Sequence, residues 1–255
     1  MRPWDGGTRL SRNLKLWGRA SSANVQKTLW ALEELGLAYE HQPLGGVYGG
    51  LDEPEYRAIN PNGLVPTLQD GTLSVWESHA ILRYLAATYG QDTLWRDDPR
   101  QRAIVDQWTD WTAMTLQPAW IAVFWLLVRT PEEQRDAKAI AAACARTVAA
   151  LRILDANLAD RDYLAGDRLS YADIAAGVAL FRWFTMEIDR PAMPGVSRVP
   201  ERSWRSWPPP WVSGTGFWSR PAVSTPTPRG PPILWPVITP RSTVDRSTGT
   251  WPSAC

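Results

Sequence analysis

The segment from residue 60 to residue 89, NPNGLVPTLQDGTLSVWESHAILRYLAATY, constrains the fold more than any other part of the chain. An Asp-Gly pair at 70–71 separates two short apolar runs, which is the strongest local signal for a β-hairpin. Pro66 cannot donate to a sheet ladder, and an X–Pro bond is the one peptide bond whose cis form costs little. A helix that opens on Glu77 and Ser78 gathers free backbone N–H groups, a carboxylate and a hydroxyl. Such a set can hold both the carboxylate and the ammonium group of an amino acid.

The residues before this segment predict a β-α-β unit. Residues 14–17 form a short strand with alternating apolar side chains, and Ser22 stands at a helix-cap position. Apolar residues recur at helical spacing up to Gly36, which supplies the C-terminal stop. Residues 38–44 form a second strand, parallel to the first because a helix lies between them. With the hairpin and its helix, this order predicts a thioredoxin-like βαβ-ββα domain over residues 13–90.

Three helix-start signals predict an all-helical domain over residues 98–195. An acidic cap followed by proline at 97–99 starts the first helix, which Pro118 bends or ends. A Thr-Pro-Glu-Glu capping box opens the Ala-rich run 130–158. The S-x-x-D pattern at 170–173 caps a third, strongly apolar helix.

The two ends of the chain differ in composition from the middle. Residues 1–12 form a polar leader without the apolar run of a signal peptide. Residues 196–255 combine dense proline with tryptophan and arginine and show no helical or strand period, so we expect an unstructured tail. Disordered linkers are usually poor in tryptophan, and this composition is typical of a GC-rich gene read out of frame. A frameshift near Gly195 and a genuine disordered tail both stay open; translation of the gene in three frames distinguishes them.

Charge and cysteine content exclude several classes of partner. The net charge of +1 argues against nucleic acid or an anionic membrane as the main partner. No apolar stretch reaches 18 residues, the best being WIAVFWLLV at 120–128, so no membrane span is expected. Two cysteines without metal-ligand spacing predict no metal site. The simplest expectation is a soluble cytoplasmic protein.

Over about residues 13–195 the chain resembles the cytosolic glutathione S-transferases, in particular bacterial, serine-type, theta- or zeta-like members. The resemblance is carried by GRASSANVQKTLWALEELGLAYE at 18–40 and by the segment 60–89. It implies a glutathione-binding domain at 13–90 and an all-helical transferase domain at 98–195. It also implies glutathione as co-substrate, a hydrophobic electrophile as second substrate, a role in detoxification, and a homodimer. Several large apolar residues are material for the second-substrate pocket, although their helical spacing makes most of them core: Trp108, Trp111, Met114, Trp120 and Trp125.

The resemblance also implies a catalytic hydroxyl. In that family the hydroxyl lies fourteen positions before the helix-ending glycine, and counting back from Gly36 gives Ser22. Ser22 would donate a hydrogen bond to the glutathione sulfur rather than attack the substrate itself. Ser21 and Asn24 stay open as alternatives close to the thiol.

The glutathione-binding residues follow from the same resemblance. The backbone of Val65, before a cis Pro66, would pair with the cysteinyl part of glutathione like an added strand. Glu77 would hold the γ-glutamyl ammonium, and Ser78 would bind its carboxylate through hydroxyl and backbone N–H. Leu64 stands where some family members carry a glutathione-contacting lysine, so the glycyl end must be held otherwise.

The leading hypothesis is therefore an enzyme, a glutathione transferase. The alternative is a non-catalytic transferase-like binding module, or a damaged gene product that retains only glutathione binding, since fold alone does not imply function. A serine hydrolase is disfavoured because the chain has only two histidines, His41 and His79, and no G-x-S-x-G turn. Asp173 resembles the helix-capping aspartate of the family's helical domain and is interpreted as a folding element.

Overall fold

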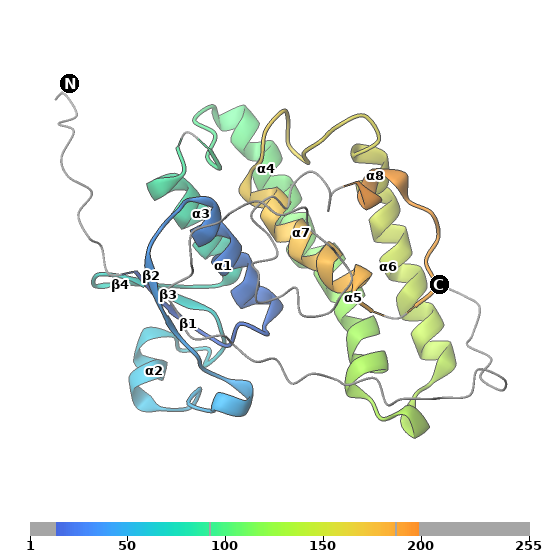
Figure 1. The fold of residues 1–255 in the computed structure, drawn as a ribbon, viewed down its shortest axis with the longest axis horizontal. Coiled ribbons are helices and arrows are strands. Elements are labelled where there is room, and N and C mark those ends of the chain that lie inside the picture. Colours follow the sequence, from blue (N-terminus) through green and yellow to red (C-terminus); the bar gives the residue numbers. More distant parts are fainter. Residues whose placement is uncertain (1–13, 92, 187, 199–255) are drawn as a thin grey trace, which may run out of the picture. The chain divides into compact units, whose positions relative to one another are not determined.

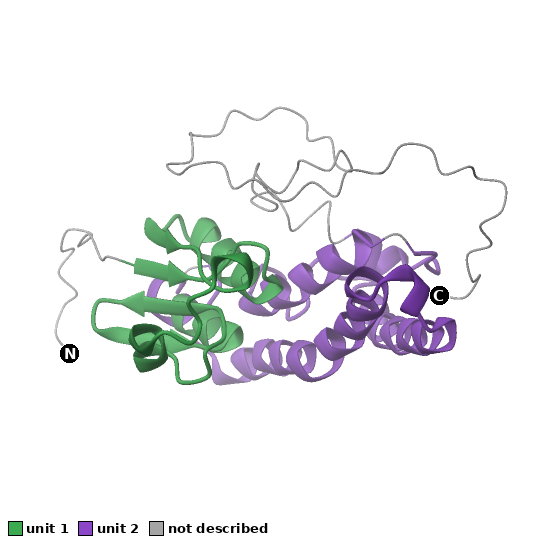
Figure 2. Cartoon of the chain, turned by 90° about the horizontal axis from the view of Figure 1, so that it is seen from below, with its two compact units in different colours: residues 1–85 green, residues 86–255 purple. Residues whose placement is uncertain are grey.

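The computed structural model describes residues 14–91, 93–186 and 188–198. The chain divides into two compact units between Leu85 and Ala86, drawn green and purple in Figure 2. The predicted leader, residues 1–12, and most of the predicted tail, residues 199–255, lie outside the described residues.

The first unit is built on a four-stranded sheet in the order β2-β1-β3-β4. β1 is parallel to β2 and antiparallel to β3, and β3 and β4 form the antiparallel hairpin. The strands are β1 (Leu14–Trp17), β2 (Tyr39–Gln42), β3 (Thr67–Asp70) and β4 (Leu73–Trp76). The parallel pair encloses a helix and the antiparallel pair is joined directly, so the predicted βαβ-ββα order is confirmed.

The hairpin differs from the expectation in its register. Asp70 pairs with Leu73, so the two-residue turn is 71–72 rather than 70–71. β3 begins at Thr67, so the Val65-Pro66 pair lies just before the strand. Proline has no N–H to give to the ladder, which is consistent with pairing that starts one residue after Pro66.

Helices cover both faces of this sheet, as Figure 1 shows. The helices of the first unit are α1 (Ala23–Glu34), the 3₁₀ turn η1 (Gly46–Tyr48), α2 (Pro54–Ile59) and the start of α3 (Ser78–Tyr89). On one face Leu14 and Leu16 are buried, at 3% and 0% exposure. On the other face the Trp17 ring lies 6.1 Å from the ring of Tyr56 in α2. The period-2 alternation of β1 therefore separates two cores, one under α1 and α3 and one under α2.

The second unit is helical, as predicted, with α7 at its centre. Twelve of the 14 residues of α7 are buried, and it packs against α4 and α5. The elements are α4 (Pro99–Trp111), the π turn η2 (Thr112–Leu116), α5 (Gln117–Phe124), the π turn η3 (Trp125–Arg129), the 3₁₀ turn η4 (Glu132–Gln134), α6 (Ala137–Asn157), α7 (Tyr171–Phe184) and α8 (Pro194–Ser197).

One of the expected helix boundaries is wrong, and one expectation is narrowed. Pro118 was expected to bend or end the first helix; it does not end it, because the π turn η2 precedes the proline and helical structure continues as α5. The capping box at 130–133 does not open the Ala-rich helix. Thr130 instead closes η3, its N–H and hydroxyl both donating to the Trp125 carbonyl, at 3.0 Å each. α6 begins at Ala137, where the Asp136 side chain accepts two backbone N–H bonds.

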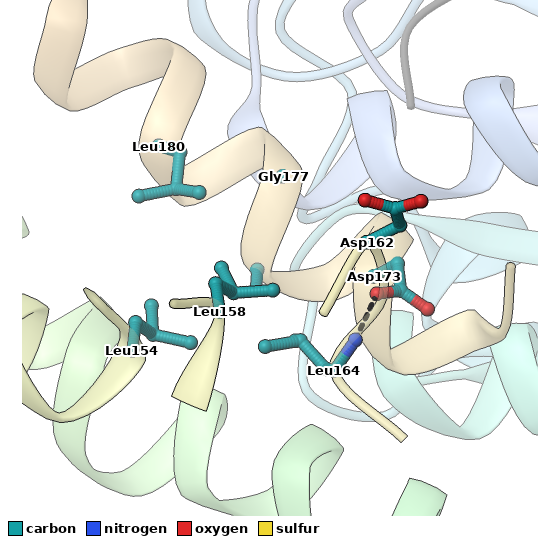
Figure 3. Close-up of a pocket in the computed structure, with 8 residues that line it drawn as sticks. Leu154, Leu158, Asp162, Leu164, Asp173, Gly177 and Leu180 are labelled. Carbon is teal, nitrogen blue, oxygen red and sulfur yellow. Dashed lines mark hydrogen bonds between the residues drawn. The ribbon is translucent and has the colours of Figure 1, made fainter. Parts of the chain in front are cut away.

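The capping box at 170–173 is confirmed. The Asp173 carboxylate accepts from the backbone N–H and the hydroxyl of Ser170, at 2.8 and 2.7 Å. It also accepts from the N–H of Leu164 at 2.7 Å, which ties the preceding loop to the helix (Figure 3). The cavity beside it measures only about 10 Å³, too small for a substrate, so this region is a folding element.

Ordered packing extends slightly past the predicted start of the tail. Val196 is fully buried in α8, and its N–H donates to the Asp155 carboxylate at 3.0 Å. Arg198 donates to the carbonyl of Leu158 at 2.9 Å. Residues 196–198 therefore belong to the helical unit rather than to an unstructured tail.

Among the residues that the structure describes, one helical run, Pro99–Arg129, is long and apolar enough to cross a membrane, by length and composition alone. The sequence was expected to contain no such run. α5, which lies within it, packs against α6 and α7. Core helices of soluble proteins satisfy the same criterion, so the run is weak evidence for a membrane.

Candidate functional site

The site of the first unit begins where β1 gives way to the turn before α1. Gly18 has φ of +140°, and a Cβ there would lie 2.9 Å from Val65 Cβ and 2.6 Å from Val25 Cγ2. Only glycine permits this backbone approach. The approach brings the start of α1 next to the Val65-Pro66 segment.

Ser22 is the N-cap residue of α1, in extended conformation, and its carbonyl accepts the N–H of Gln26 at 2.9 Å. Its side chain makes no capping hydrogen bond and is half-buried. Ser21 is exposed, and Asn24 lies in the first turn of the helix. The predicted cap position of Ser22 is confirmed, while its hydroxyl is not used to cap the helix.

The peptide bond between Val65 and Pro66 is cis, as the resemblance implied. Side chains behind it hold the preceding carbonyl, that of Leu64: Tyr56 donates to it at 2.5 Å and Asn60 at 2.8 Å. Both side chains also bond Thr67 Oγ1, at 2.9 and 3.0 Å. Sequence reasoning missed the supporting role of Tyr56 and Asn60; the Asn in the NPNG turn was the available signal.

Leu64 itself is 62% exposed. An exposed apolar side chain therefore stands at the position where, by the resemblance, some family members carry a lysine.

α3 opens on Glu77 and Ser78. The Glu77 carbonyl accepts the N–H of Ile81 at 2.9 Å, so the helix starts there, and Glu77 has φ of 69°. A left-handed conformation is unusual for a non-glycine residue and is often found at functional sites. Glu77 is exposed, whereas Ser78 is buried at 6% exposure. Ser78 Oγ lies 3.4 Å from Asn24 Oδ1, which brings the first turns of α1 and α3 together.

Behind these two helix starts lies a buried basic pair that sequence reasoning missed. Lys27 and His79 are 1% and 9% exposed, and Lys27 Nζ lies 2.8 Å from His79 Nε2. Lys27 Nζ also donates to Asn24 Oδ1 at 3.1 Å. Burial lowers the pKa of Lys27 to about 7, although the negative charge of Glu77 acts in the opposite direction. Burial, and then the charges of Lys27 and Arg83, lower the pKa of His79 to about 2, so its ring is neutral.

The arrangement suits an anionic, peptide-like ligand. Two helix N-termini direct their backbone N–H groups and positive dipole ends to the same region, where an anion is stabilised. The backbone before Pro66 precedes the first residue of β3. It can therefore pair with an extended chain. Within residues 14–91, 93–186 and 188–198 no group of three or more metal-ligating side chains occurs.

A thioredoxin-like sheet with a cis proline before its hairpin, joined to a helical unit, defines the class of fold. Family models for the glutathione S-transferase N-terminal domain and C-terminal domain match residues 12–87 and 116–202. Glutathione S-transferase GstB of Escherichia coli K12 is 41% identical over 205 residues, covering 73% of this chain and 99% of GstB. Glutathione S-transferase 4 of Zea mays is 36% identical over 164 residues, covering 64% of this chain and 74% of that protein.

Among solved structures, the theta class glutathione S-transferase of the citrus canker pathogen Xanthomonas axonopodis pv. citri, with glutathione bound, is 46% identical with a TM-score of 0.72. The match covers 75% of this chain and 92% of that chain. The chain therefore belongs to the glutathione S-transferase family, and the expected fold class is confirmed.

Proposed function

We propose that this protein is a glutathione transferase in which Ser22 stabilises the glutathione thiolate for attack on a hydrophobic electrophile. The observation that carries the proposal is the N-cap hydroxyl of Ser22, which makes no capping hydrogen bond at a helix start beside the cis Pro66 segment. Membership of the transferase family supports the same reaction class.

The energetic demand on Ser22 is modest. A free thiol has a pKa near ~8.5, so only a few per cent of it is ionised at neutral pH. Lowering that pKa by about two units requires roughly 2.7 kcal/mol of preferential stabilisation of the thiolate. A hydroxyl donor at the positive end of a helix can supply energy of this order.

The rest of glutathione is assigned to the two neighbouring segments. The backbone of Val65, before Pro66, pairs with the cysteinyl residue, as a peptide pairs with a sheet edge. The exposed Glu77 carboxylate takes the γ-glutamyl ammonium, and Ser78 takes the γ-glutamyl carboxylate at the N-terminus of α3. The left-handed φ of 69° at Glu77 supports a functional reading of that residue.

The wider context of the protein belongs to the same proposal. A cytoplasmic homodimer with a role in detoxification is what the family resemblance implies. The alternative is a binding module, or a damaged gene product, that holds glutathione without turnover.

Retention on immobilised glutathione, combined with turnover of 1-chloro-2,4-dinitrobenzene, tests the proposal. We expect wild type to be retained and active, and Ser22→Ala to be retained but nearly inactive. Ser21→Ala and Asn24→Ala are the matched variants; a loss of turnover confined to either one would move the thiol contact to that residue. Retention of wild type without turnover would support the binding module instead.

A further inference from the structure

Arg19 is a half-buried arginine that the proposed reaction does not use. It stands in the turn between β1 and α1, where its backbone N–H donates to the Leu44 carbonyl at 2.9 Å and its carbonyl accepts the N–H of Ser22 at 3.0 Å. Within the described part of the chain, its guanidinium makes no hydrogen bond or ion pair. A guanidinium is always charged and offers several donors in a planar fork, so one without a protein partner can receive an anionic ligand.

Two acidic side chains of the adjoining segments are engaged by other cations. Glu40 of β2 lies 3.5 Å from the ammonium group of Lys15. Asp52, in the loop before α2, lies 2.5 Å from the guanidinium of Arg57. Neither carboxylate therefore compensates the positive charge at the β1–α1 turn through an ion pair.

The glycine loop that follows β2 fixes where this guanidinium lies. A Cβ at Gly46 would lie 3.0 Å from Arg19 Cδ and 3.3 Å from Nε, and a Cβ at Gly45 would lie 3.3 Å from Nη1. Both glycines have positive φ, 78° at Gly45 and 62° at Gly46. The backbone thus passes the arginine more closely than side chains would permit, and it restricts the positions open to the guanidinium.

The order of the strands places Arg19 beside the segments assigned to glutathione. β1, β2 and β4 end, and β3 begins, at the same edge of the sheet. In the order β2-β1-β3-β4, the segments along this edge are the glycine loop at 45–50, the turn with Arg19, the Val65-Pro66 pair and the start of α3 at Ser78. Arg19 and the glycine loop therefore continue the line that runs from Ser78 through Val65.

Glutathione laid along this edge brings its third residue to Arg19. With the γ-glutamyl residue at Ser78 and the cysteinyl residue at Val65, the ligand runs from β4 toward β1. Neighbouring strands are ~4.8 Å apart and an extended residue spans ~3.4 Å, so the residue after the cysteinyl one reaches the β1 turn. Leu64 offers no charge there, so the glycyl carboxylate needs a cation from another segment.

We propose that Arg19 binds the glycyl carboxylate of glutathione. The inference rests on the proposed function, because it takes Ser78 and Val65 as the contacts of the other two residues. The contact is a charge-assisted hydrogen bond from the guanidinium to the carboxylate, and no covalent bond changes. Arg19 thereby makes the site selective for a tripeptide whose C-terminal carboxylate is free.

Titration calorimetry with S-methylglutathione and with its glycyl monoethyl ester tests the inference. The ester keeps the γ-glutamyl and cysteinyl parts and removes only the glycyl charge. We expect wild type to bind the acid roughly 10- to 100-fold more tightly than the ester, and Arg19→Met to bind the two within about twofold of each other. Arg19→Lys should keep part of the preference, because lysine keeps the charge and loses the planar fork.

Lys138→Met is the control, since it removes one exposed cation from the helical unit and should match wild type with both ligands. Equal binding of acid and ester by wild type overturns the inference and leaves the proposed function intact. An equal loss of affinity for both ligands in Arg19→Met also overturns it, because the arginine then supports the fold and not the carboxylate. No binding of either ligand by wild type overturns both proposals.

Arg19→Lys decides alone if Arg19→Met does not fold. A preference for the acid that is smaller than in Lys138→Met supports the inference, because only the contact with the carboxylate has changed. A preference as large as in Lys138→Met overturns it, because the guanidinium fork then contributes nothing to binding.

Discussion

Two helices of this protein begin at a serine, and the two serines are used differently. Ser170, at the start of α7, is fully buried, and both its N–H and its hydroxyl bond Asp173. Ser22, at the start of α1, is half-buried and its side chain makes no capping bond. The hydroxyl at α7 bonds the Asp173 carboxylate, whereas the hydroxyl at α1 makes no capping hydrogen bond. A cap residue that does not cap is therefore a better functional candidate than its sequence pattern suggests.

Asp173→Ala should produce the largest effect, because it removes the acceptor of three buried donors: Leu164 N–H, Ser170 N–H and the Ser170 hydroxyl. We expect a loss of about 4 kcal/mol in the free energy of unfolding, measured by urea denaturation. The exposed Asp160→Ala should stay within about 0.5 kcal/mol of wild type. A loss below about 1 kcal/mol for Asp173→Ala would contradict the folding role of this cap.

Ser22→Ala should lower turnover at neutral pH by up to roughly 30-fold, because the bound thiol returns toward its ordinary pKa near ~8.5, at which only a few per cent of it is ionised. Its free energy of unfolding should change by less than about 0.5 kcal/mol, since no capping bond is lost. Initial rates across pH and a urea titration measure the two quantities. If Ser22→Ala were destabilised but fully active, Ser22 would be an ordinary helix cap like Ser170.

Ser170→Ala should give the opposite pattern. Loss of the hydroxyl bond to Asp173 should cost about 1.5 kcal/mol of stability, with turnover per folded molecule unchanged. Thermal and urea unfolding, together with the transferase assay, check both halves. Any loss of turnover beyond the loss of folded protein would show that the α7 cap also serves the site.

The last prediction concerns Lys27 and is a dependence on pH. Its pKa is about 7 in the folded state against about 10.4 in the unfolded state, so between these values the unfolded chain binds more protons. Wild-type stability should therefore rise with pH in this window, by up to about 1.4 kcal/mol per pH unit from this group. The difference in unfolding free energy between wild type and Lys27→Met should grow in favour of wild type from pH 7.5 to 9. A constant difference, like that expected for Lys138→Met, would show that Lys27 does not titrate there.

The two capping-box patterns show how far local sequence could be trusted. The pattern at 170–173 was predicted correctly because both partners are within one helical turn. The pattern at 130–133 failed because Thr130 bonds backward to Trp125 and closes a π turn. A local motif shows which hydrogen bonds a side chain can make. Which of them forms also depends on the element that precedes it.

The cis Pro66 segment shows a similar division. Its cis bond was expected from the family resemblance and is present. The bonds that hold the Leu64 carbonyl come from Tyr56 and Asn60, and their meeting with Thr67 depends on how α2 packs against the sheet. That packing could not be read from spacing along the chain.

The βαβ-ββα order, the family, the cap position of Ser22 and the helix start at Ser78 could all be predicted from the sequence, because they depend on local patterns and short motifs. The contact of Lys27 with His79, 52 residues away, in a buried cluster beside Asn24 could not be predicted in this way. The charge state of a lysine depends on desolvation and on its neighbours in space, and neither exists until the two helices are packed.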